Sequence, residues 1–164
     1  MALLIRDNFP VDLDTFWNRV FLVEDYQRRN HVEGMGFRTY RLVREDRQEN
    51  GEITRVIQVD PGSLPGLLQK VLGDVGYTET GRFDPSRRRW NFTIQPAKVG
   101  DRIQVEGELW AEPTKEGVTR FCKVDVRVRL PGIGGRVAKA MEAMTRDNQS
   151  KSTVFTRRYI AELN

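Results

Sequence analysis

Apolar and polar side chains alternate along residues 118–130, and this alternation constrains the fold more than any other feature of the sequence. One face of the segment carries Val118, Cys122, Val124, Val126, Val128 and Leu130. The other face carries Thr119, Lys123, Asp125, Arg127 and Arg129. A period of two residues with one apolar face is typical of a strand in an antiparallel sheet that is buried on one side. We therefore expect this segment to cover the core with one face and to meet solvent with the other.

Several earlier segments have the same character and are separated by short turns. The expected strands are residues 3–12, 37–45, 52–60, 75–83, 89–97 and 102–112. The dipeptide Asn50-Gly51 is a strong hairpin signal between two of them. Strands that follow one another through short turns predict an antiparallel sheet of about six or seven strands.

Two short helices are expected between the first and second strands. Asp12 or Asp14 can cap a helix over residues 13–21, and residues 23–36 are expected to form a second short helix that is ended by Gly34 and Gly36. The aromatic side chains of the first helix are expected to pack on the sheet: Phe16, Trp17 and Phe21.

Residues 137–164 are expected to form one long terminal helix whose apolar stripe is interrupted. The stripe consists of Val137, Met141, Met144, Phe155, Tyr159 and Leu163. Between Met144 and Phe155 it passes through Asn148 and then Lys151 or Ser152. Burying polar groups without partners costs roughly 1–3 kcal/mol each, so the middle of the helix should not face a solid core. Either it faces a cavity, or the helix breaks near Asn148, or Asn148 bonds a neighbouring backbone group.

Residues 60–74 interrupt the series of strands with two prolines, three glycines and a short apolar run. The apolar residues are Leu67, Leu68, Val71 and Leu72. One interpretation is an exposed helical flap that acts as a lid or touches a membrane surface transiently, with Lys70 and Arg82 near the lipid head groups. The other is a loop tucked over the sheet edge.

Composition narrows the class of protein. A length of 164 residues fits one domain, and no stretch approaches the roughly 20 apolar residues of a membrane span. The N-terminus lacks the apolar region of a secretory signal, and a single cysteine excludes an internal disulfide framework, so a cytoplasmic protein is expected. The net charge of +4 is spread along the chain, which makes nucleic-acid binding an unfavoured function.

Motifs for catalysis and metal binding are missing from the sequence. The chain has one histidine, His31, and one cysteine, so a zinc site is not expected. It has no nucleophile elbow, P-loop or dinucleotide fingerprint. His31 could act as a general acid or base, but a position at a helix end beside the helix dipole is the favoured interpretation. We therefore assign no catalytic residue, metal or cofactor.

Charged residues on the inward faces of strands are better candidates for a binding site. By alternation, Glu79 shares a face with Tyr77, Arg120 lies on the apolar face of the last strand, and Arg55 lies beside Ile57. A buried Glu–Arg pair could hold a polar ligand group, or it could be a structural salt bridge. A register error of one residue would turn these side chains outward.

The order of these elements resembles the START / Bet v 1-like superfamily, also called SRPBCC. The resemblance rests on FPVDLDTFW (9–17), EGELW (106–110), EGVTRFCKVDVRVRLPGIGGRV (116–137) and the terminal helix. Within the superfamily, VDPGSLPGLLQKVLG (59–73) and LPGIGG (130–135) are similar to a bacterial group, the DUF2505 type. The resemblance implies an α+β helix-grip fold over residues 1–164, in which a curved antiparallel sheet wraps around the C-terminal helix. It also implies an apolar cavity between the two, because members bind lipids, sterols or polyketide-like molecules.

The expected function is that of a soluble protein holding a lipid or another hydrophobic small molecule in this cavity. The residues expected to contact the ligand are Tyr40, Glu79, Trp90, Phe92, Arg120, Met144, Asn148, Ser152 and Phe155. A cyclase or dehydratase using the same cavity is one alternative. A co-chaperone-like protein-interaction module is the other, and it predicts an interior filled by side chains.

Overall fold

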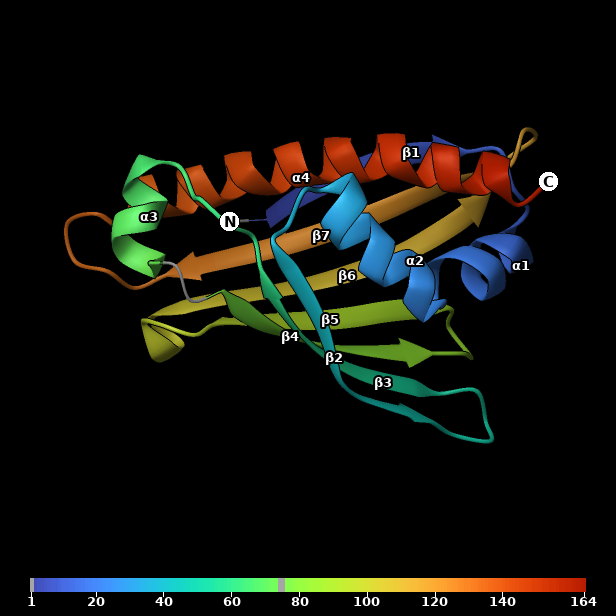
Figure 1. Ribbon diagram of the computed structural model, residues 1–164, viewed down its shortest axis with the longest axis horizontal. Helices are drawn as coiled ribbons and strands as arrows, with labels where there is room; N and C mark the ends of the chain where they lie inside the picture. The colour runs from blue at the N-terminus through green and yellow to red at the C-terminus, as the bar shows by residue number, and fades with distance from the viewer. Residues whose placement is uncertain (1, 74–75) are drawn as a thin grey trace.

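The computed structural model describes residues 2–73 and 76–164 of the chain (Figure 1). The strands are β1 Ala2–Phe9, β2 Thr39–Arg47, β3 Ile53–Asp60, β4 Tyr77–Asp84, β5 Arg89–Pro96, β6 Ile103–Pro113 and β7 Val118–Val128. The helices are α1 Leu13–Thr15, α2 Glu24–Arg29, α3 Gly66–Leu72 and α4 Gly134–Glu162, and further helical segments are η1 Phe16–Phe21, η2 Asn30–Gly34 and η3 Gly100–Arg102. Asp74 and Val75, where the predicted insert ends and a predicted strand begins, lie outside the described residues.

All seven strands form one antiparallel sheet, in the order β1-β7-β6-β5-β4-β3-β2. Figure 1 shows α4 lying along this sheet, which confirms the predicted α+β helix-grip architecture. The alternation predicted for β7 is also confirmed, because Val118, Cys122 and Val124 are buried while Lys123 is exposed. The register is therefore correct in the strand that most constrained the prediction.

The predicted helix pair follows β1 and packs on one end of the sheet. The Asp12 side chain accepts a hydrogen bond from the Thr15 backbone N–H at 2.8 Å, so Asp12 is the N-cap. Trp17 and Phe21, as expected, belong to the core: their rings lie 5.0 Å from Phe83 and 5.6 Å from Trp90, respectively. This aromatic cluster closes one end of the space between the sheet and α4.

Helix α4 is continuous over 29 residues, so a break near Asn148 is excluded. Its first turns bury Val137 and Met141, and its last turns bury Phe155 and Ile160. The middle differs, because Met144 and Asn148 are only half-buried. Helix α4 thus packs on the core at both ends, whereas its middle turns do not pack on a closed core.

The insert between β3 and β4 combines the two interpretations of the sequence. It contains a helix, α3, but this helix is tucked against the core rather than exposed. Leu68 is fully buried, and Leu67, Val71 and Leu72 are half-buried against the same core. This packing contradicts the exposed flap, since the apolar side that would touch a membrane is turned inward. Of the helices in the described ranges, none is long and apolar enough to cross a membrane.

Candidate ligand pocket between the sheet and helix α4

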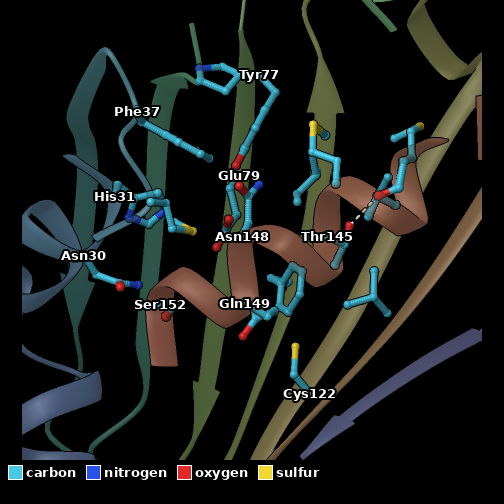
Figure 2. Close-up of a pocket in the computed structure, with 18 of the residues that line it drawn as sticks. Asn30, His31, Phe37, Tyr77, Glu79, Cys122, Thr145, Asn148, Gln149 and Ser152 are labelled. Atoms are coloured by element: carbon cyan, nitrogen blue, oxygen red, sulfur yellow. Dashed lines mark hydrogen bonds between the residues drawn. The ribbon is translucent and has the colours of Figure 1, made fainter. Parts of the chain in front are cut away.

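A pocket with a volume of about 170 Å³ lies between the concave face of the sheet and the middle of α4 (Figure 2). The apolar part of its sheet wall consists of Trp90, Phe92, Ile94, Val105, Leu109, Cys122, Val124 and Val126. Its helix wall consists of Met141, Met144, Thr145, Asn148, Gln149 and Ser152. Residues of α2, η2 and the loop before α3 complete the lining, so three separate parts of the fold enclose the space.

Two glycines explain why large aromatic side chains on the sheet leave this space open. A Cβ atom added at Gly81 would lie 2.0 Å from the Trp90 ring, and one at Gly107 would lie 2.0 Å from the Phe92 ring. Each ring therefore lies flat over a neighbouring strand where a side chain is missing. The rings form the floor of the pocket instead of filling it.

The polar residues that interrupt the apolar stripe of α4 border this pocket. Thr145 donates a hydrogen bond to the Met141 carbonyl at 2.8 Å, and the Gln149 side-chain oxygen accepts one from Arg120 at 3.2 Å. The Asn148 side chain makes no hydrogen bond within the described ranges of the chain. The alternative that Asn148 bonds a neighbouring backbone group is therefore not supported.

Glu79 projects from β4 into the pocket without a partner. Figure 2 shows Tyr77 and Glu79 of β4 and Asn148 of α4 pointing into the same part of the pocket. In the part of the chain that the structure describes, the Glu79 carboxyl forms no hydrogen bond and no ion pair. Burial raises the pKa of Glu79 to about 7, and the positive charge of Arg55 opposes this rise only in part.

The predicted Glu–Arg pair in the pocket is wrong, because both candidate arginines have other partners. Arg55 lies 2.7 Å from Glu45 and also donates to the Leu22 carbonyl at 2.8 Å. Arg120 lies 3.0 Å from Asp7 and donates to Gln149 and Thr153. In each pair the two residues face each other directly across neighbouring strands. Both arginines are thus neutralised by carboxylates of the edge strands β1 and β2.

His31 lies in the last turn of η2, as expected for a helix-end residue, and it also belongs to the pocket wall. Its Nδ1 lies 2.6 Å from the Gln27 carbonyl, and its ring packs against Phe37 and Tyr40. Burial lowers the pKa of His31 to about 4, so the imidazole is neutral at neutral pH and Nδ1 donates to the carbonyl. A neutral ring adds no positive charge near Glu79.

Seven of the nine residues predicted to contact a ligand line the pocket: Glu79, Trp90, Phe92, Arg120, Met144, Asn148 and Ser152. The other two, Tyr40 and Phe155, are not part of the lining. Tyr40 packs against His31, and Phe155 packs between Tyr26 and Tyr159 in the core. Both are aromatic residues, which are common in the walls of apolar pockets. In this fold they pack behind the side chains that line the pocket, so they do not border it.

Several polar residues of the lining were not among the predicted ligand contacts, notably Asn30, Tyr77, Thr145 and Gln149. Asn30 is buried, and its Oδ1 has no hydrogen-bond partner among the described residues. Alternation along β4 already placed Tyr77 on the same face as Glu79, so Tyr77 could have been predicted to line the pocket from the sequence. No signal in the sequence marked Asn30, because its position depends on how η2 packs on α4.

The chain matches the family model described as "Protein of unknown function (DUF2505)" over residues 5–160. A search of curated protein sequences found no match. Among solved structures, a protein of Thermus thermophilus is 14% identical, with full coverage of both chains and a TM-score of 0.67.

Two further solved structures resemble the chain. A START superfamily protein from Mycobacterium smegmatis is 13% identical, with 96% of this chain and 97% of that chain covered and a TM-score of 0.59. The Zhui aromatase/cyclase from a Streptomyces species is 12% identical, with 98% and 95% covered and a TM-score of 0.61. At these identities the likeness concerns the fold alone. The chain therefore belongs to the DUF2505 family, and its fold is that of the START / Bet v 1-like superfamily.

Proposed function

We propose that this protein binds a compact, largely apolar small molecule in the pocket between the sheet and α4. The observation that carries the proposal is a pocket with aromatic and aliphatic walls in which two of the polar groups, Glu79 and Asn148, lack protein partners among the described residues. Ligand sites typically combine an apolar lining with a few polar groups that fix orientation. Apolar burial would supply the affinity, and the polar groups would supply the orientation.

The size of the pocket favours a ligand with one or two rings over a long-chain lipid. Its volume of about 170 Å³ lies below the roughly 300–1,000 Å³ of pockets that hold drug-sized molecules. A lipid chain would require side chains such as Met35, Phe92 and Met144 to move. Methionine is adaptable enough for a modest expansion of the pocket.

An enzymatic role of the cyclase type is the second candidate, and one observation favours it. A carboxyl group with a pKa of about 7 is poised to donate or accept a proton at neutral pH, and Glu79 has this property. The other reactive groups of the pocket are less suited to catalysis. Burial raises the pKa of the Cys122 thiol to about 11, so this thiol is not an activated nucleophile.

The experiment that tests the binding function is native mass spectrometry of the purified protein, followed by solvent extraction and identification of any small molecule. We expect a co-purifying molecule of low mass that Asn148→Leu depletes without unfolding the protein. Val154→Leu is the matched control, because Val154 lies on the same helix and is 67% exposed. An empty protein that also binds no member of a panel of small aromatic compounds would overturn the proposal.

A further inference from the structure

The pocket holds one carboxyl group whose charge no group in the described part of the chain neutralises. Glu79 stands on the sheet wall and Asn148 on the helix wall, and both point into the same part of the space (Figure 2). Over residues 2–73 and 76–164, neither side chain has a hydrogen-bond or ion-pair partner. The two walls therefore offer acceptor oxygens toward a common volume.

The basic groups around Glu79 are committed elsewhere. Arg55 is 3% exposed and is bound by Glu45, while Arg120 is bound by Asp7. His31 is neutral and donates its Nδ1 proton to the Gln27 carbonyl. Asp60, a second carboxylate of the lining, already has Arg38 at 3.3 Å. A cation that entered the pocket would thus find Glu79 unoccupied.

Resting on the proposed function, we infer that the ligand carries a protonated amine. The Glu79 carboxylate and the Asn148 side-chain oxygen accept hydrogen bonds from this ammonium group, and the apolar part of the ligand lies on Trp90 and Phe92. A half-buried carboxylate without a partner is partly desolvated at a cost, and an ammonium group offsets that cost through a charge-assisted hydrogen bond. Asn148 can turn its oxygen toward the ammonium, because no partner in the described chain fixes its amide.

An ammonium group beside Glu79 would oppose the effect of burial on its pKa. Burial favours the protonated acid, and a neighbouring ammonium would favour the carboxylate. The titratable groups that interact electrostatically with this carboxyl are Arg55 of β3, Tyr40 of β2, Tyr77 of β4 and Cys122 of β7. None of them supplies the positive charge at hydrogen-bonding distance that an amine would bring.

The test compares two probes of nearly equal shape, 2-phenylethylamine and 2-phenylethanol, by calorimetric titration at pH 8. Wild-type protein is expected to bind the amine about tenfold more tightly than the alcohol, the range for a hydrogen bond to a charged group. Glu79→Gln should abolish this preference and leave alcohol binding within about twofold. Glu106→Gln, which removes a charge from the exposed face of β6, should leave both affinities unchanged.

The outcomes separate the two proposals. Equal binding of both probes to the wild type, or an amine preference that survives in Glu79→Gln, would overturn the amine site and leave the binding function intact. Failure of both probes to bind would count against the pocket as a ligand site and against the amine site with it. If Glu79→Gln does not fold, Asn148→Leu replaces it, and it should weaken the amine several-fold more than the alcohol.

Discussion

The last turns of α4 and its middle both place polar side chains on the inward face, but they use them differently. Near the C-terminus, Thr156 is fully buried, and its Oγ1 lies 2.6 Å from the Tyr26 hydroxyl and donates to the Ser152 carbonyl at 2.7 Å. Thr153 accepts from Arg120 at 3.2 Å. In the middle, Asn148 is half-buried and has no such partner within the described chain.

Polarity alone therefore does not distinguish a helix turn that borders a cavity from one that packs in a core. Buried polar groups in native proteins are hydrogen-bonded with few exceptions, and each exception calls for an explanation. The C-terminal turns follow the rule and form a closed core. Asn148 in the middle of α4 and Glu79 on β4 are only half-buried and have no protein partner in the described chain, so these positions are the candidates for contact with something other than protein.

The largest effect should come from the closed core. Phe155→Ala is expected to lower the free energy of unfolding by about 3–5 kcal/mol, because the ring packs between Tyr26 and Tyr159 and lies under Arg29. Urea unfolding measures this loss. The folded variant should still bind pocket probes with wild-type affinity, and a loss of binding in the folded protein would mean that Phe155 belongs to the site.

Removing the buried hydroxyl of Thr156 should have the next largest effect. Thr156→Val is expected to cost about 1–3 kcal/mol in unfolding free energy, because the Tyr26 hydroxyl then loses its acceptor. Adding Tyr26→Phe to this variant should lower the unfolding free energy little further, because it removes the Tyr26 hydroxyl that Thr156→Val leaves unsatisfied. A double variant whose loss equals the sum of the single losses would contradict the shared hydrogen bond.

Glu79→Gln should stabilise the protein in a pH-dependent way. The pKa of Glu79 is raised from 4.5 to about 7 in the folded state, so its stabilising contribution is present below pH 4.5 and is lost as pH rises through 7. At pH 8 we expect the variant to be more stable by about 2 kcal/mol, with a difference that shrinks toward pH 4.5.

His31 masks the contribution of Glu79 to the pH dependence of stability when the wild-type protein is measured alone. The pKa of His31 is lowered from 6.5 to about 4, so its contribution is present above pH 6.5 and is lost as pH falls through 4. The two groups partly cancel between pH 4 and 7. Unfolding curves of both proteins at several pH values isolate Glu79, and a difference that does not change with pH would refute the buried carboxyl.

Asn148→Leu should have the smallest effect on stability. We expect a change in unfolding free energy within about 0.5 kcal/mol, since the amide has no partner in the described chain to lose and leucine adds apolar contact at the pocket wall. Thermal unfolding of Asn148→Leu, measured in parallel with the control variant Val154→Leu, tests this expectation. A loss as large as that of Thr156→Val would show that Asn148 belongs to the packed core after all.

Much of the fold could be predicted because it depends on local pattern. The period of two in β7, the hairpin signal at Asn50-Gly51 and the cap at Asp12 each depend on residues close together in the chain. The same alternation identified Glu79 and Arg120 as inward-facing, and the interrupted stripe identified Asn148. Seven of the nine predicted contact residues line the pocket for this reason.

The sequence by itself thus determined which segments are strands and helices and which side chains point inward, because these properties repeat with the period of the backbone. Only the tertiary structure decided the partner of each inward polar group. Arg55 and Arg120 bind Glu45 and Asp7 because the sheet places each pair directly across neighbouring strands. Glu79 has no basic residue opposite it, since its neighbours across β3 and β5 are Ile57 and Ile94. Pairing between strands distant in sequence, and not the composition of any one strand, leaves this carboxyl open to the pocket.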